Sequence, residues 1–255
     1  MAITHTFVRD DAVLSVRDWG GGGTPMVLIH GLGGNQREWD ALGVRLARQF
    51  RIVTYDQRGH GVSSLSNDYS WDTRVGDLVA LLKELELHDV TLVGHSLGAG
   101  VALEVANRID DCGALVLIDG ALPVELPVRD GTEAGHTVRN LFVTAGRTAI
   151  HRIMRHAPMS YLELSRIGDD YRGRFSEFDR ALHTVACPTL LLLGSRIERG
   201  PTGPAFQVVR EEAARRAVEV NPRIRVQWID GRHNMIRTHP REIAADVSLL
   251  HADVR

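Results

Sequence analysis

The chain has 255 residues, of which 44% are hydrophobic and 24% are charged, which is enough apolar material to bury a sizeable core in a single domain. Its 30 Lys and Arg against 32 Asp and Glu residues give a formal net charge of −2, so no global electrostatic attraction favours nucleic acid or an anionic membrane. The opening residues MAITHTFVRDD lack the pattern of a secretion signal, and no apolar run approaches the roughly 20 residues that span a bilayer. We therefore expect a cytoplasmic protein with neither of these partners.

The predicted elements begin with a β-hairpin. Residues 3–8 and 12–19 alternate around a polar turn, and a run of four glycines follows. Beyond it, apolar runs typical of buried strands alternate with amphipathic stretches. The predicted strands cover residues 26–29, 52–55, 90–93, 114–118, 190–193 and 224–229, and the predicted helices cover residues 39–50, 73–87, 97–109, 205–220 and 240–250. This alternation predicts an α/β fold, a mostly parallel twisted sheet with helices on both faces.

One long segment interrupts the alternation. Between residues 120 and 179, short helical stretches are broken repeatedly by Pro and Gly. Insertions of this length within a compact domain are usually functional. We therefore expect a helical lid over residues 120–179, inserted before the penultimate strand, and a core formed by residues 1–119 and 180–255.

A serine between two glycines marks the joint between the strand at 90–93 and the helix that follows it. Gly94, Ser96 and Gly98 have the spacing G-x-S-x-G within the segment VTLVGHSLGAGVAL. In a nucleophile elbow this spacing forces the serine into a strained turn that exposes its Oγ at the carboxyl edge of the sheet. Ser96 is therefore the predicted nucleophile.

A serine nucleophile needs a general base and donors for the oxyanion. The segment DGRHNMIRTHP follows the last predicted strand and places His233 just past its carboxyl end, which makes His233 the predicted base. The segment IHGLGGN at 29–35 follows the first parallel strand. Its glycines permit a tight turn that directs the N–H of Leu32 inward, opposite the N–H of Leu97, so these two groups are the predicted oxyanion hole.

Together, these motifs resemble the α/β-hydrolase superfamily. The resemblance covers nearly the whole chain and rests on HGLGG, DQRGHGVSS, GHSLGAG, CPTLLLLG and GRHNMIRTHP, which occur in that order. Within the superfamily, the chain is most similar to lid-bearing esterases, lactonases and cofactor-free haloperoxidases. The resemblance implies a structural role for Asp56, Arg58 and Ser63 in the second motif, and it implies no cofactor. No metal is expected, because Cys112 and Cys187 lack the spacing of a metal or redox motif.

The acid of the triad is where the chain departs from the family pattern. The usual aspartate follows the penultimate strand, but GSRIERG offers Glu198 there. A glutamate can orient the histidine and stabilise its imidazolium. Asp119, after the strand at 114–118, is the alternative. Glu198 is favoured, since an aspartate in the second position often only caps the strand end.

The resulting prediction is a serine hydrolase of the carboxylesterase, lactonase or thioesterase type, acting through an acyl-serine on a small to medium, partly apolar acyl substrate. Leu32, Leu141, Phe142 and Ile153 are its predicted substrate contacts. The alternatives are a ligand-binding or signalling protein with negligible turnover, a perhydrolase or haloperoxidase-like enzyme, and a C–C bond hydrolase. The sequence favours no oligomeric state.

Overall fold

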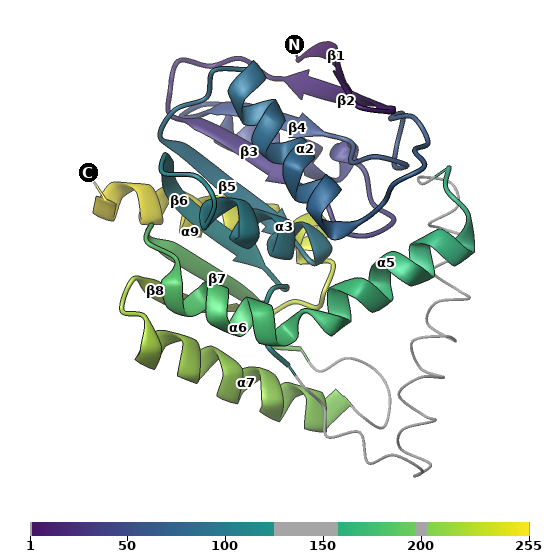
Figure 1. The fold of residues 1–255 in the computed structure, drawn as a ribbon. Helices are drawn as coiled ribbons and strands as arrows, with labels where there is room; N and C mark the ends of the chain where they lie inside the picture. The colour runs from purple at the N-terminus through teal and green to yellow at the C-terminus, as the bar shows by residue number, and fades with distance from the viewer. Residues whose placement is uncertain (1, 125–157, 197–202, 255) are drawn as a thin grey trace.

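The computed structural model describes residues 2–124, 158–196 and 203–254 (Figure 1). Its eight-stranded sheet has the order β1-β2-β4-β3-β5-β6-β7-β8. The hairpin of β1 and β2 joins β4 in antiparallel register, and from β4 to β8 every pairing is parallel. The strands are β1 (Ile3–Arg9), β2 (Ala12–Asp18), β3 (Pro25–Ile29), β4 (Arg51–Tyr55), β5 (Val90–His95), β6 (Cys112–Ile118), β7 (Thr189–Gly194) and β8 (Ile224–Ile229).

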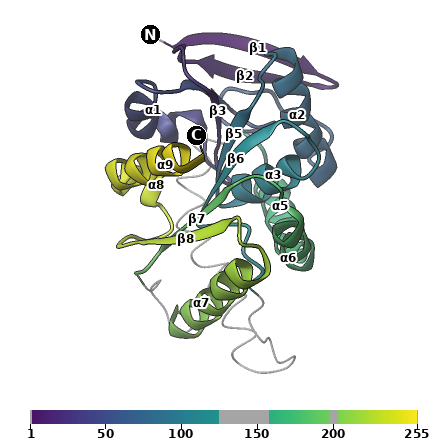
Figure 2. The same cartoon turned by 90° about the vertical axis from the view of Figure 1, so that its left-hand side faces the viewer.

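Helices cover both faces of the sheet, as Figure 2 shows with the sheet seen from its edge. One face carries α2 (Trp71–Glu84), α3 (Leu97–Ala106), α5 (Tyr161–Gly173), α6 (Phe175–Thr184) and α7 (Gly203–Val220). The other face carries η1 (Gln36–Trp39), α1 (Asp40–Leu46), α8 (Met235–Thr238) and α9 (Pro240–Val254). The predicted α/β-hydrolase fold is confirmed.

Alternation along the strands divides the core into two layers. On β3, Val27 and Ile29 belong to the layer beneath α2 and α3, whereas Met26 and Leu28 belong to the layer beneath α1 and α9. Successive side chains of a strand point to opposite faces, so a strand covered on both sides must be apolar throughout. This is why the central strands read in the sequence as continuous apolar runs.

Capping residues decide where two helices begin. Ser70 accepts a hydrogen bond from the N–H of Thr73, so α2 starts at Trp71, two residues before the predicted start. Asn35 accepts from the N–H of Arg37 and starts the short helix η1, which α1 then continues. The helix predicted at residues 39–50 is therefore the shorter α1, which ends at Leu46 and is preceded by η1.

The segment predicted as a lid is described only in part, since residues 125–157 lie outside the described residues. Helix α5 begins at a capping box formed by Ser160 and Glu163, and α6 runs across residue 179. The rings of Tyr171 on α5 and Phe178 on α6 lie 5.2 Å apart, and that of Trp71 on α2 lies 5.7 Å from Phe178. These rings anchor α5 and α6 to the core.

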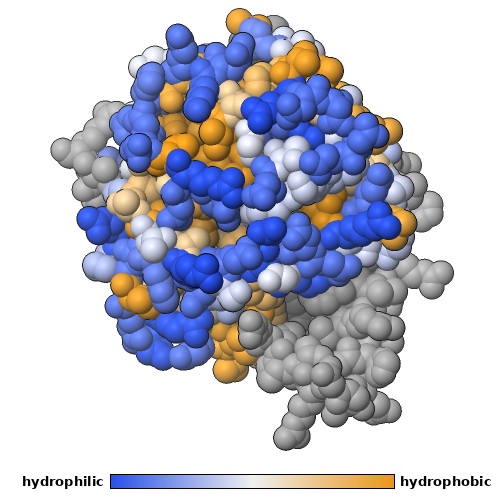
Figure 3. Space-filling view, viewed as in Figure 1, coloured by the Kyte–Doolittle hydropathy of each residue, from blue (hydrophilic) through white to orange (hydrophobic). Residues whose placement is uncertain are grey.

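The surface above α2, α3 and α6 is mainly hydrophilic, with apolar side chains gathered in small areas (Figure 3). Scattered exposure of this kind is normal for a globular protein. Within the described part of the chain, no helix has both the length and the apolar character needed to cross a bilayer.

Candidate active site

The turn between β5 and α3 holds Ser96 in a strained conformation. Its φ of 53° and ψ of −118° lie in a region that residues with a side chain rarely adopt. The two flanking glycines are sterically required, because a Cβ on Gly94 would lie 2.2 Å from the oxygen of Gly98, and one on Gly98 would lie 2.3 Å from that of Ile29. The sequence motif is thus a real elbow, with a half-buried serine at its apex.

Ser96 and Asp119 follow neighbouring strands at the same edge of the sheet. His95 pairs with Ile118 in the parallel register of β5 and β6, and the N–H of Ser96 donates to the oxygen of Ile118 at 2.9 Å. The next residue of each strand is therefore Ser96 on one side and Asp119 on the other. Ligand sites of open parallel sheets lie at this carboxyl edge.

His233 reaches this edge from β8, two strands away from β6. Its loop passes the end of β7, where the N–H of Arg196 donates to the oxygen of Gly231 at 3.1 Å. Nδ1 of His233 then donates to Oδ2 of Asp119 at 2.7 Å. A carboxylate can only accept, so this bond puts a proton on Nδ1, and in the neutral ring the lone pair is then on Nε2. The predicted base thus has the tautomer that a general base requires.

The structure therefore brings the alternative acid, Asp119, against His233. Asp119 has a φ of 48° at the end of β6, a backbone conformation in which its side chain faces the His233 loop. Glu198, favoured from the sequence, lies outside the described residues. The preference for Glu198 rested on the usual position of the acid in the family and on the frequent capping role of an aspartate after a strand. Neither reports that β6 supplies a carboxylate within hydrogen-bond distance of His233.

Asp119 is almost fully enclosed, with 8% of its side chain exposed. Burial alone raises the pKa of this carboxyl, but the His233 hydrogen bond and charge, the Arg210 charge and the N–H of Gly194 outweigh it, so the pKa lies well below its ordinary value. Arg210 on α7 and the N–H of Gly194 both donate to Oδ1. Oδ2 is thereby left to His233.

His95 lies beneath His233. Their ring centroids are 4.8 Å apart, and Nε2 of His95 donates to the backbone oxygen of His233 at 2.8 Å. Burial, with a smaller contribution from the charge of His233, lowers the pKa of His95 to about 3. A neutral His95 therefore supports the position of His233 without adding a competing charge.

The loop after β3 contacts the elbow. A Cβ on Gly31 would lie 3.1 Å from Cβ of Ser96, so the backbone that leads to Leu32 directly adjoins the serine. The N–H of Gly33 donates to Nε2 of the buried His60 at 3.0 Å, which fixes the loop from behind. Leu97 is the first residue of α3, where a backbone N–H has no partner within the helix. The two predicted oxyanion donors thus belong to segments that adjoin Ser96, through Gly31 in one case and directly in the other.

The second motif forms a buried network below this loop. Both carboxylate oxygens of Asp56 accept backbone N–H groups, from Gln36 at 2.7 Å and from Val62 at 3.0 Å. Ser63 donates to the backbone oxygen of Asp56 at 2.6 Å, and the fully buried Arg58 makes a two-point contact with Asp77. These side chains bind one another and the backbone, which suits the structural role implied by the resemblance.

Among the predicted substrate contacts, only Leu32 is described. It is half-buried, and its Cδ2 lies 3.4 Å from the position of a Cβ on Gly168 of α5. Leu141, Phe142 and Ile153 lie outside the described residues. No sequence pattern pointed to Arg210, whose helix is an ordinary amphipathic stretch, or to Tyr171, which donates to the backbone oxygen of Ser96.

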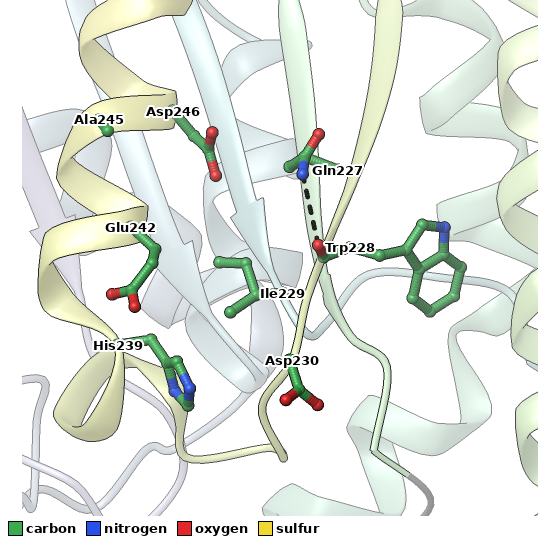
Figure 4. A pocket seen from close by; sticks show the side chains of 8 residues that line it. All are labelled: Gln227, Trp228, Ile229, Asp230, His239, Glu242, Ala245 and Asp246. Atoms are coloured by element: carbon green, nitrogen blue, oxygen red, sulfur yellow. Dashed lines mark hydrogen bonds between the residues drawn. The ribbon is translucent and has the colours of Figure 1, made fainter.

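A separate hollow of about 500 Å³ lies between β8 and α9 (Figure 4). Its polar lining residues are Gln227, Asp230, His239, Glu242 and Asp246. Ser96, Asp119 and His233 are not among the residues that line it. It lies outside the candidate site, and an acidic surface depression with no further feature indicates no ligand.

Comparison with known proteins agrees with the geometry. A model of the alpha/beta hydrolase family matches residues 26–246. The chain belongs to this family. The matched residues include Ser96, Asp119 and His233, so the family assignment covers the part of the chain that carries the candidate site.

Curated relatives match parts of this chain. An uncharacterized protein of Mycobacterium tuberculosis is 40% identical over 89 residues, which are 34% of this chain and 26% of that protein. A non-heme chloroperoxidase of Kitasatospora aureofaciens is 43% identical over 102 residues, 39% of this chain and 37% of that protein. The matched regions thus span about a quarter to two-fifths of the length of these relatives.

Solved structures match over nearly the whole chain. The hydrolase of E-2-(acetamidomethylene)succinate has a TM-score of 0.75 at 21% identity, covering 99% of this chain and 100% of that one. Bromoperoxidase from Bacillus anthracis has a TM-score of 0.72 at 23% identity, covering 99% and 100%. An esterase from Exiguobacterium antarcticum has a TM-score of 0.74 at 22% identity, covering 94% and 96%. At these identities the likeness establishes the shared fold.

Proposed function

We propose that the protein is a serine hydrolase in which Ser96 is the nucleophile, His233 the general base and Asp119 the acid that orients it. The observation that carries this proposal is the 2.7 Å hydrogen bond from His233 to Asp119, at the sheet edge where Ser96 occupies a strained elbow. Nucleophile, base and orienting acid arranged in this way are the recurring requirement for acyl transfer at a serine.

The proposed reaction begins when Ser96 Oγ attacks the acyl carbonyl carbon and passes its proton to Nε2 of His233. The N–H groups of Leu32 and Leu97 donate hydrogen bonds to the carbonyl oxygen and stabilise the negative charge that develops on it. The leaving group then takes the proton from His233, and the carbonyl re-forms as an acyl-serine. Water then attacks the acyl carbon as His233 takes its proton. His233 returns this proton to Ser96 Oγ, and the carboxylic acid is released.

The ionisation state of Asp119 supports this cycle. Its lowered pKa means that the carboxylate is charged across the physiological range, so it can stabilise the imidazolium that forms on His233. Leu32 contributes an apolar, half-buried surface next to the serine. The charged Asp119 suits acyl transfer to a serine, and the apolar surface of Leu32 suits a small to medium, partly apolar acyl substrate, whether ester, lactone or thioester.

Turnover of a panel of p-nitrophenyl esters, lactones and acyl thioesters tests the proposal. The matched variant is Ser96→Ala, which removes only the hydroxyl. We expect multiple turnovers on at least one class by the wild type and none by the variant. A burst without a steady state would instead favour a ligand-binding protein, and full activity in Ser96→Ala would exclude the serine mechanism.

A second candidate is perhydrolysis, which the similarity to a non-heme chloroperoxidase favours. The same acyl-serine would be attacked by hydrogen peroxide in place of water, giving a peracid and free Ser96. The peracid would then oxidise a halide in solution. Bromination of a dye in the presence of acetate, bromide and peroxide tests this, and dependence on Ser96 would distinguish it from a background reaction.

A further inference from the structure

Arg210 lies behind the acid of the proposed triad. It comes from α7, 91 residues after Asp119, and its guanidinium contacts Oδ1 while His233 holds Oδ2. Only 7% of the Arg210 side chain and 8% of the Asp119 side chain are exposed. One buried carboxylate is thus shared between a permanent cation and the imidazole that must become a cation during catalysis.

The surroundings of Arg210 hold it in place. Its guanidinium carbon lies 5.6 Å from the ring of Phe206 and 5.9 Å from that of Trp228, and Gln207 accepts a hydrogen bond from it at 3.5 Å. Figure 4 shows the indole of Trp228 on the opposite side of β8 from Glu242 and Asp246. Arg210 is therefore held against two aromatic rings on the α7 side of the sheet, with its guanidinium on Asp119.

We propose that Arg210 is a positioning residue that fixes Asp119 and weakens the basicity of His233. This inference rests on the proposed function of the triad. A cation bound to one carboxylate oxygen stabilises the ionised acid, and across that carboxylate it repels an imidazolium on the other oxygen. His233 consequently stays neutral, and able to accept the Ser96 proton, at lower pH than it would beside Asp119 alone.

Other titratable groups of the described residues also lie near His233. His95 packs against its ring but is kept neutral by burial. Glu38 of η1 interacts with His233 electrostatically and favours the imidazolium, but it also faces Arg237 of α8. Asp119 favours the imidazolium directly. Arg210 is the buried cation that opposes them through the shared carboxylate.

The first test is the pH profile of kcat/KM for Arg210→Gln and Arg210→Met. The methionine variant keeps an apolar side chain against the rings of Phe206 and Trp228. We expect the acid limb to move up by about 0.5 to 1 pH unit in both, since loss of a nearby cation raises the basicity of His233. Arg210→Lys, which keeps the charge, should leave the limb in place. Arg216→Gln is the matched control, because Arg216 lies on the same helix and pairs with Asp179, outside the site.

A limb that stays in place while kcat falls would overturn the proposal and leave Arg210 with a structural role only. The second test needs no turnover and no substitution of Arg210. In Asp119→Asn the neutral amide no longer screens the guanidinium, so the NMR titration midpoint of the His233 ring should fall below the roughly 6.5 of an ordinary histidine. A midpoint at or above that value would contradict the inference. Because this titration does not depend on activity, failure of the proposed hydrolase function would be recognised separately.

Discussion

The hydroxyl of Tyr171 donates to the backbone oxygen of Ser96 at 3.2 Å and accepts the N–H of Ala121 at 2.8 Å. Helix α5 is thereby tied both to the elbow that holds the nucleophile and to the residues that follow Asp119. Burial raises the pKa of Tyr171 to about 12, so the hydroxyl keeps its proton at any working pH. A single side chain thus links the segment predicted as a lid to Ser96 and to the loop that follows Asp119.

Tyr171→Phe should lower kcat by about three- to tenfold, because it removes both hydrogen bonds and lets the strained elbow relax. The expected loss of unfolding free energy is about 1 kcal/mol. Tyr161→Phe is the control, since Tyr161 begins the same helix and is 46% exposed. Kinetics and urea unfolding of both variants check the prediction, and equal effects of the two would refute it.

Asp119→Asn should reduce kcat by ~10³ to 10⁴, because the amide no longer selects the productive tautomer of His233 or stabilises its imidazolium. Glu198→Gln should change kcat by less than about twofold if Asp119 is the acid. Steady-state kinetics of the two variants at one pH decide between them. The opposite ranking would transfer the role to Glu198.

Ser96→Ala and His233→Ala should each cost ~10⁴ to 10⁶ in kcat, and the double variant should cost no more than either one. The residues act as a unit, so once one is lost the other contributes almost nothing. Labelling by a fluorophosphonate gives a second readout, which should be absent in Ser96→Ala and slowed strongly in His233→Ala. Losses that multiply would show that the two residues act independently.

Acid should destabilise the fold partly through Asp119. Its pKa in the folded state lies below the ordinary 3.8, so its ionised form stabilises the fold above that pH. The contribution is then lost as pH falls from about 4 toward the folded-state value. Urea unfolding of the wild type between pH 6 and pH 3 should therefore lose more free energy than that of Asp119→Asn. Parallel curves would show that Asp119 does not contribute.

Arg58→Met should cost about 3 to 5 kcal/mol of unfolding free energy, because it leaves the carboxylate of Asp77 buried without its partner. Arg58 is fully buried and binds Asp77 through two nitrogens, at 2.6 and 2.7 Å. Asp40→Asn removes an ion pair with Arg17 in which Asp40 is 51% exposed, and should cost less than about 1 kcal/mol. Comparable losses in the two variants would contradict the structural role of Arg58.

The sequence by itself determined the features that depend on local spacing. The elbow at Ser96 requires glycine at two positions where any side chain would collide with neighbouring backbone. This requirement is visible in five consecutive residues of the sequence. The central strands follow from apolar runs that must fill both faces of a parallel sheet. His233 follows from its place just after the last strand, because parallel strands present their carboxyl ends at one edge.

The tertiary structure decided which side chains meet at that edge. Asp119 and Glu198 follow adjacent strands, β6 and β7. A hydrogen bond requires the two atoms to be placed to within about an ångström, and strand position alone does not determine which carboxylate meets that requirement. The bond from His233 to Asp119 spans 114 positions of the chain, and the contact with Arg210 spans 91. Both depend on the order of the strands, the path of the loop after β8 and the docking of α7. These are set by packing between distant segments, which local spacing and periodicity do not encode.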